Sequence, residues 1–337
     1  MSPSTGDRVA ALGNAAGEAL SDLVETAGTF GRDLADTGGL AAGRIPGVGI
    51  ALRWSLHWIG TVVSAAADLV ATVLKVVVEL AVALVVVVVR LIAAGASAVG
   101  GAGRSGAGAG VGGRRTFVQG VGETAASLAG PVLVTSGKAL ALVQAVLLGQ
   151  RGERPLTAEE RARLDRVFRG SVALYNVRVV DGFSGLFGLN RRPFTLGNTI
   201  YMKGYLRRRG PERYAATLVH ECGHVWQNQN VGTRYAIQAL WAQCTIADRY
   251  DWEKELARGN VRWSDFNREA QAQLLMHVWQ HGRSGTDAAP GAFYAEDPIG
   301  AAHFTWNGVD RTALAREAVA TMRGARSHRY SKRLEGR

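Results

Sequence analysis

The chain has 337 residues, which is enough for more than one domain and an extended apolar core. Its formal net charge of +11 favours contact with anionic surfaces such as phospholipid headgroups or nucleic acid. No aromatic-interleaved RNA-binding motif and no recognition-helix pattern occurs, so nucleic acid is not expected as a partner. The two cysteines, Cys222 and Cys244, are too few for a disulfide framework and are predicted to be reduced.

Residues 1–54 are rich in glycine and alanine, and we expect one or two short helices in an otherwise loosely ordered segment. The first residues lack a basic start followed by an apolar core, so no cleavable signal peptide is expected.

Residues 55–100 are strongly apolar and predict one long helix, because no proline interrupts residues 58–94. The charged residues of this run share one narrow stripe at 100° per residue: Asp68, Lys75, Glu79 and Arg90, with Thr61 and Thr72. Such a helix can span a membrane, lie in its interfacial plane or be buried in a helical bundle. The sequence therefore predicts membrane association through residues 55–100, and a location at a membrane or secretion by a non-classical route.

Residues 101–154 predict a glycine-rich linker with short helices, and residues 155–325 form a domain of different composition, followed by a basic tail over 326–337. In that domain, Thr157 and Glu160 indicate a capping box at the start of a helix. "NVRVV" (176–180) and "NTIYM" (198–202) predict two short strands. Further helices are expected from Pro211 to about Gly232, over 234–258, and from a cap at Ser264 to Gly282.

The segment "TLVHECGHVWQNQN" (217–230) carries the clearest chemical signal. His220 and His224 are four residues apart, so on a helix both imidazoles project from one face and can meet one Zn²⁺. Glu221 follows the first histidine, where it can act as general base without binding the metal. Gly223 lets a neighbouring element approach this helix closely. The motif predicts a catalytic zinc site with Glu221 as its base.

A catalytic zinc site usually takes three protein ligands. Gln227 and Asn230 stand where the metzincin extension would require glycine and histidine, so the third ligand is expected on a later helix. Glu269 is the best candidate, in the first turns of the helix that follows Ser264. The acidic alternatives in range are Asp248, Glu253, Glu255 and Asp265, and we interpret the second histidine pair, His277 and His281, as half-exposed residues near a helix end.

Three blocks of this chain resemble a known family. They are Val177, Arg178 and Val179; Phe194, Thr195, Gly197, Ile200 and Tyr201; and Leu218, His220, Glu221, His224 and Gln227. The pattern is similar to that of the predicted zincin-like metallopeptidase domains of the bacterial contractile-injection-system core (DUF4157-like), over roughly residues 157–280, and departs from it at Asn228. The resemblance implies a zincin fold in which a small strand pair roofs the active-site helix, with a glutamate as third zinc ligand.

Together these signals predict a mostly helical α+β fold: a zincin-like domain with a small strand pair, preceded by an all-α apolar N-terminal region. The expected activity is zinc-dependent hydrolysis of a peptide or protein substrate, with Zn²⁺ held by His220, His224 and Glu269. The strand at 195–202 can bind extended peptide by strand addition. Tyr250, Tyr294 and His303 are candidates for stabilising the oxyanion.

Two alternatives stay open on the sequence alone. The chain is a membrane-inserting effector or a secretion-apparatus component whose zincin-like domain is structural or self-processing, or it is an inactive zincin-like binding module. The substrate and the oligomeric state are not predicted.

Overall fold

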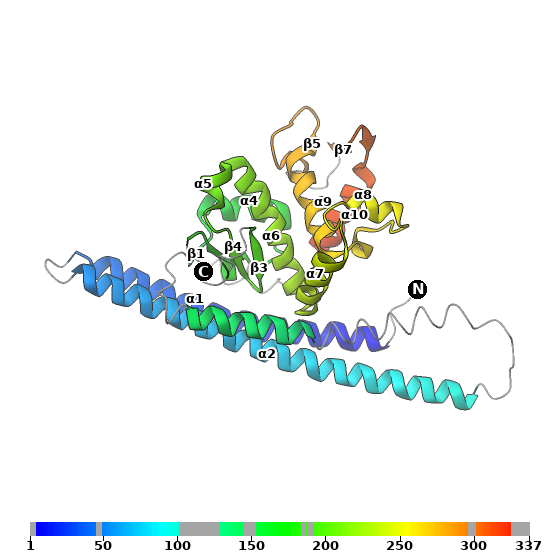
Figure 1. Ribbon diagram of the computed structural model, residues 1–337, viewed down its shortest axis with the longest axis horizontal. Helices are drawn as coiled ribbons and strands as arrows, with labels where there is room; N and C mark the ends of the chain where they lie inside the picture. The colour runs from blue at the N-terminus through cyan, green and yellow to red at the C-terminus, as the bar shows by residue number, and fades with distance from the viewer. Residues whose placement is uncertain are drawn as a thin grey trace.

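The computed structural model describes residues 5–44, 49–100, 129–144, 153–182, 187, 192–295 and 301–324. Residues 101–154 were expected to form a glycine-rich linker with short helices, and of these 101–128 and 145–152 lie outside the described residues, as does the expected basic tail over 326–337. The described part is mostly helical with a few small strand groups, which confirms the predicted mostly helical α+β fold. A long helical hairpin lies along one side of a smaller mixed domain (Figure 1).

The hairpin consists of α1 (Thr5–Ala42) and α2 (Gly49–Gly100). α2 confirms the long apolar helix, but the expectation of a loosely ordered segment before it was wrong, because α1 is a single helix of 38 residues. α1 is helical because it packs against α2, and glycines and alanines lie at the contact between the two helices. A Cβ at Gly60 would lie 3.1 Å from that of Ala35, and Gly28 faces Ala67 with no room for a side chain.

The polar stripe of α2 faces the smaller domain. Lys75 donates a hydrogen bond of 2.6 Å to the backbone carbonyl of Asn228, and the carboxylate of Glu79 accepts from the backbone N–H of Thr233 at 3.0 Å. Thr61 and Thr72 on the same stripe are buried. These contacts account for the charges of Lys75 and Glu79, while the side chain of Arg90 lies outside the described residues.

A helix over residues 129–144 lies between the hairpin and the smaller domain. Its Lys138 is buried, forms an ion pair with Asp68 of α2 and donates to the hydroxyl of Thr199 at 3.2 Å. Gly130 and Gly137 allow the helix to pack closely on the domain. A Cβ added at Gly130 would lie 2.6 Å from Cα of Arg234, and one added at Gly137 would lie 2.7 Å from a methyl group of Leu196.

The smaller domain, residues 153–324, contains a four-stranded sheet in the order β1-β2-β4-β3. The strands are β1 (Glu153–Pro155), β2 (Arg178–Val180), β3 (Phe194–Leu196) and β4 (Thr199–Tyr201). β2 and β4 are parallel, and the outer pairs are antiparallel. The two predicted strands correspond to β2 and β4, and the structure adds a strand on either side. A two-residue turn joins β3 to β4, with Gly197 at φ +61°.

Helices cover this sheet and complete the domain. α4 (Ala158–Phe168) begins with the predicted capping box of Thr157 and Glu160. α5 (Tyr205–Arg209) precedes α6 (Pro211–Val231), which has proline in its first turn and Gly232 at its end, as predicted. The residues 234–258, which were expected to be helical, form two helices, α7 (Arg234–Thr245) and α8 (Trp252–Ala257).

The last predicted helix is α9 (Arg268–His281), but its cap is Asn267 rather than Ser264, which lies in the short 3-10 helix η3 (Trp263–Asp265). After α9 come β5 (Arg283–Ser284), the 3-10 helix η4 (Ala292–Tyr294), β6 (Ala302–His303), β7 (Thr305–Trp306), β8 (Val309–Asp310) and α10 (Thr312–Gly324). β5 pairs with β6 and β7 with β8, both antiparallel.

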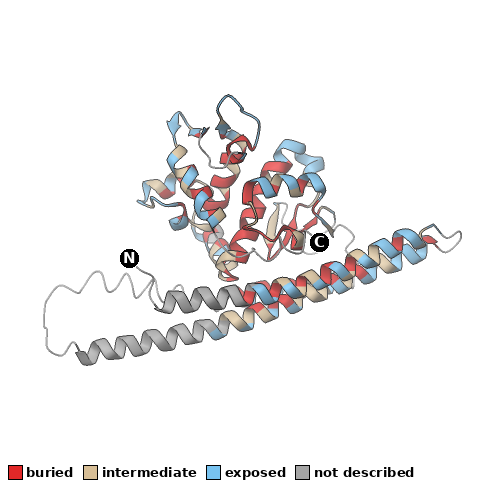
Figure 2. Ribbon diagram, turned by 180° about the vertical axis from the view of Figure 1, so that it is seen from behind, coloured by how far each residue is buried: buried red, intermediate tan, exposed pale blue. Residues whose placement is uncertain are grey.

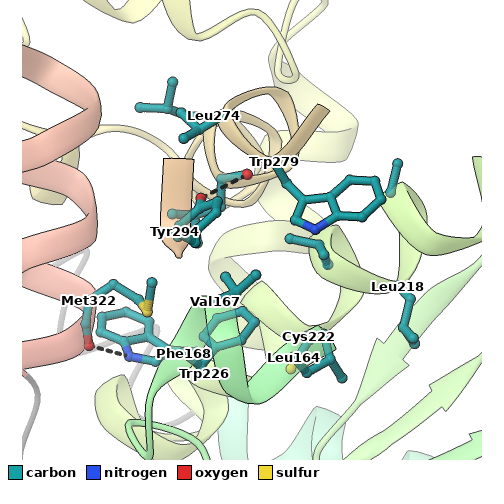
Figure 3. Packing of buried hydrophobic residues seen from close by; sticks show 14 of the residues in the cluster. Leu164, Val167, Phe168, Leu218, Cys222, Trp226, Leu274, Trp279, Tyr294 and Met322 are labelled. Atoms are coloured by element: carbon teal, nitrogen blue, oxygen red, sulfur yellow. Dashed lines mark hydrogen bonds between the residues drawn. The ribbon is translucent and has the colours of Figure 1, made fainter. Parts of the chain in front are cut away.

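The core of the smaller domain is apolar and lies between α4, α6, α9 and α10 (Figure 3). Trp226 of α6 reaches across it and donates from its indole N–H to the carbonyl of Met322 at 3.0 Å. Tyr294 donates to the carbonyl of Leu275 at 3.0 Å. Cys222 is a buried free thiol within this core, so its predicted reduced state agrees with its packing, while the side chain of Cys244 lies outside the description.

Candidate metal centre

Helix α6 places the motif residues in the interior of the domain. His220, Glu221 and His224 are all buried, and the two imidazole rings lie one helical turn apart with centroids separated by 5.0 Å. A mostly buried helix can hold three polar side chains only if other groups bond to them. The partners come from α9 and β3.

α9 supplies the carboxylate. Asn267 caps this helix by accepting hydrogen bonds from the backbone N–H groups of Glu269 and Ala270, both at 3.0 Å. The cap is itself held by Glu255, which accepts from the Asn267 side-chain amide at 3.0 Å. Glu269 therefore lies in the first turn of α9, pointing at α6, and is only 2 % exposed.

Gly223 lets the two helices approach. A Cβ at this position would lie 3.2 Å from Cβ and 3.3 Å from Cα of Ala272 on α9, which is tighter than ordinary contact. The predicted role of Gly223 is confirmed. The close approach sets the distance between the two histidines of α6 and the carboxylate of α9.

The three side chains converge on one point. One oxygen of Glu269 lies 3.4 Å from Nε2 of His220 and 3.3 Å from Nε2 of His224. Two atoms bound tetrahedrally to one zinc ion at ~2.0–2.1 Å would be separated by ~3.3–3.4 Å, so these spacings fit a shared zinc ion. Among the described residues, His220, His224 and Glu269 form the only group of three or more metal-binding side chains whose ligand atoms lie within 4.8 Å of one another.

Gln227 orients the second histidine. Nδ1 of His224 lies 2.8 Å from Oε1 of Gln227, whose amide nitrogen donates to the carbonyl of Arg268 and to Gln271 on α9. This bond directs Nε2 of His224 toward Glu269, as second partners of metal-binding histidines usually do. Nδ1 of His220 has no hydrogen-bond partner among the described residues.

The charges of the cluster are strongly coupled. Burial alone would lower the pKa of His224, but the carboxylate of Glu269 outweighs it and raises this pKa to about 9. Burial would raise the pKa of Glu269, yet the two histidines lower it well below its usual range. Glu269 is thus a carboxylate at neutral pH, the form that binds a cation.

Glu221 is held by β3 rather than by α9. The hydroxyl of Thr195 lies 2.9 Å from a carboxylate oxygen of Glu221 and 3.0 Å from its backbone carbonyl. Glu221, the candidate general base, is therefore held beside His220, His224 and Glu269. Its carboxylate bonds to Thr195 and forms no ion pair with these three residues in the described structure. Thr195 is one of the residues that resemble the zincin-like family, but no specific role was predicted for it.

A cavity of about 420 Å³ opens onto these residues. Tyr250 lines it, with its ring centroid 5.9 Å from that of His220, and burial raises the pKa of its hydroxyl. Tyr294 is buried in the core and bonded to Leu275, and His303 lies on β6 beside a different cavity. Of the three oxyanion candidates, only Tyr250 lies at the site.

The competing residues have other partners. Asp248 pairs with Lys254, Glu253 with Arg311, and Glu255 with Arg258 and the cap residue Asn267. Asp265 lies in η3 within bonding distance of the Ser264 hydroxyl. His277 is hydrogen-bonded through one ring nitrogen to Trp252 and lies 2.6 Å from Gln273 through the other. The second histidine pair is a packing feature, in which His277 stacks on Trp306 and the ring of His281 is tilted against the same indole.

The outer edge of β3 is partly occupied. The hydroxyl of Tyr235, on α7, accepts a hydrogen bond of 3.0 Å from the backbone N–H of Gly197 and lies 3.5 Å from the carbonyl of Thr195. Strand addition at this edge, predicted from the sequence, therefore requires Tyr235 to move. The ring of Tyr235 also stacks 6.5 Å from His224.

Comparison of the chain with protein-family models, with curated proteins and with solved structures found no match. The resemblance to the zincin-like domains thus stays a prediction.

Proposed function

We propose that this protein is a zinc-dependent metallopeptidase whose N-terminal half associates with a membrane. The observation that carries the enzymatic part is the convergence of His220, His224 and Glu269 at zinc-like spacings, with Glu221 beside them and bonded elsewhere. Two imidazoles and one carboxylate are a ligand set of catalytic zinc sites in hydrolases.

Zinc bound there would polarise the peptide carbonyl and lower the pKa of water. The protein groups then have separate tasks. Glu221 takes the proton of the attacking water and passes it to the leaving amine, while the Thr195 hydroxyl keeps its carboxylate in place. Tyr250 lines the cavity, where its hydroxyl can donate a hydrogen bond to the developing oxyanion.

Metal content and turnover test this assignment. Purified full-length protein should contain one zinc per chain, and His220→Ala and Glu269→Ala should lose it or bind it weakly. Glu221→Gln should keep the zinc and lose turnover by roughly 10²–10⁴-fold. A folded wild-type protein without zinc would contradict the metal site, and unchanged turnover in Glu221→Gln would contradict the mechanism.

The membrane part rests on the surface of the hairpin. The 31 residues of Gly49–Glu79 are long and apolar enough to cross a membrane. On α2, Leu52, Ile59, Val63, Val70 and Val77 are exposed and fall within roughly 40° of one another at 100° per residue. They lie opposite the polar stripe that contacts the smaller domain.

α1 repeats this pattern. Its buried face carries Ser21, Glu25, Thr29 and Arg32, and its exposed face carries Leu20, Leu23, Phe30 and Leu34. Both helices therefore turn polar groups inward and apolar groups outward. Figure 2 colours the described part of the hairpin by burial. Water disfavours this arrangement and a lipid environment favours it, because apolar surface is stabilised by leaving water.

Because α6 and the 129–144 helix are docked on the middle of α2, this conformation supports binding of the hairpin in the plane of the interface. Flotation of the full chain with phosphatidylcholine vesicles tests it, with a Val63→Ser, Val70→Ser, Val77→Ser triple variant expected to lose at least about tenfold in partitioning. Val261→Ser, at an exposed valine of the smaller domain, is the matched control. A wild-type chain that stays monomeric and free of vesicles would contradict membrane binding.

A further inference from the structure

The cavity beside the metal centre has a wall that comes from the N-terminal half of the chain. Leu133, Ser136, Gly137 and Leu140 of the 129–144 helix line it, and they recur at spacings of three and four residues on one helical face. The wall therefore belongs to a segment far from the motif in the sequence, which Figure 1 shows alongside the hairpin.

This helix is fixed in place at several points. Gly130 and Gly137 bring it into close contact with Arg234 and Leu196, and Val134 is buried against the sheet. Lys138 binds both Asp68 and Thr199. The helix thus forms one side of the cleft and contacts both the hairpin and the smaller domain.

The cleft has a polar side and an apolar side. Its metal side carries His220, Glu221, His224 and Glu269, whereas the facing surfaces are mainly apolar. Leu133 and Leu140 are half-buried, so part of each side chain remains open to the cavity. Leu240 of α7 and Leu196 of β3 extend the same apolar surface.

We propose that Leu133 and Leu140 determine substrate specificity by contacting an apolar side chain next to the scissile peptide bond. The inference rests on the proposed peptidase function and deepens it. It assigns to the N-terminal half a direct part in substrate recognition, in addition to its contact with lipid. A cavity of about 420 Å³ that is shared with the scissile bond has room for an aliphatic or single-ring side chain.

The test compares cleavage profiles on a proteome-derived peptide library for wild type, Leu140→Arg, Leu140→Ala and Val132→Arg. Val132 lies on the same helix, is 65 % exposed and does not line the cavity. Leu140→Arg should reduce kcat/KM for peptides with an apolar residue at the cleaved bond by roughly 10–200-fold and shift the preference toward acidic residues. Leu140→Ala should widen the preference toward larger aromatic residues, and Val132→Arg should leave the profile unchanged.

Measurements of zinc content and peptide binding distinguish a failure of this inference from a failure of the proposed peptidase function. Each variant should retain one zinc per chain, and in a Glu221→Gln background Leu140→Arg should raise the Kd of an apolar wild-type substrate peptide by a similar factor. Zinc-loaded Leu140 variants with the wild-type profile and Kd would overturn this inference while leaving the peptidase function intact. A zinc-loaded wild type that cleaves no library peptide would instead overturn the proposed function.

Discussion

The hairpin and the smaller domain differ in the side chains that they bury. The smaller domain has a core of large apolar side chains, including Trp252, Trp263, Phe293 and Phe304, beside the buried polar residues of the candidate metal centre. In the hairpin the buried face carries Ser, Thr, Glu, Arg and Lys, while leucine, valine and phenylalanine are exposed. The core of the smaller domain is thus typical of a fold stabilised by burying apolar side chains away from water. The exposed apolar face of the hairpin supports the membrane binding that we propose for it.

The largest expected difference in stability is between phenylalanine-to-alanine substitutions in the two regions. Phe293→Ala removes a fully buried ring and should lower the free energy of unfolding by about 3–5 kcal/mol. Phe30→Ala, at a ring that is 65 % exposed on α1, should change it by less than about 0.5 kcal/mol in buffer. Urea denaturation measures both. Equal losses would mean that the hairpin has an ordinary apolar core.

The next effect concerns a charged group buried in the smaller domain. Burial alone would raise the pKa of Glu160, but hydrogen bonds from Arg154, Thr157 and Tyr214 outweigh it and lower this pKa from 4.5 to about 2. Because the folded pKa is depressed, the ionised group stabilises the fold above pH 4.5, by about 3 kcal/mol, and the contribution is lost as pH falls toward 2.

Glu160→Gln should therefore lower stability by about that amount at pH 7, with a difference from wild type that shrinks as the pH falls through this range. Unfolding in urea across pH 2–7 measures it. Glu159→Gln is the control, since Glu159 is exposed and should not alter stability. A difference that does not depend on pH would show that Glu160 acts through packing alone.

A smaller effect is expected at the contact between the two regions. Lys75→Met removes the hydrogen bond to Asn228 and should destabilise the protein by about 1–3 kcal/mol, because a buried polar contact is lost. Limited proteolysis should then release the hairpin sooner. Lys254→Met, which breaks an exposed pair with Asp248, should have no such effect. Unchanged protease resistance in Lys75→Met would argue that the polar stripe does not hold the hairpin.

The smallest effect in buffer is expected on the outer face of α2. Val70→Ser should change the free energy of unfolding by less than about 0.5 kcal/mol, because Val70 is 52 % exposed. Thermal unfolding without lipid measures this. A clear loss would mean that the face is packed against another protein surface in solution.

The features that depend on the spacing of nearby residues could be predicted from the sequence. His220, Glu221 and His224 follow from one helical turn, and Glu269 follows from its place near the start of a later helix, although the cap was assigned to Ser264 instead of Asn267. The strands β2 and β4 were likewise visible as short β-branched runs.

The remainder depends on contacts between distant segments. α1 is helical over 38 residues because α2 packs against its small side chains, a stabilisation that its own composition does not reveal. The 129–144 helix lines the cleft because Gly130 contacts α7 and Gly137 contacts β3. A signal was present in the spacing of these two glycines on one helical face, but it does not name the partner.

The hydroxyl of Tyr235 has a consequence for how the molecule behaves in concentrated solution. β3 is the last strand of its sheet, and an uncovered last strand offers free N–H and C=O groups to other chains. Tyr235 lies against the carbonyl of Thr195 on this strand and bonds to the N–H of Gly197 in the adjoining turn. The same side chain that lines the cleft therefore hinders the pairing of another chain with β3.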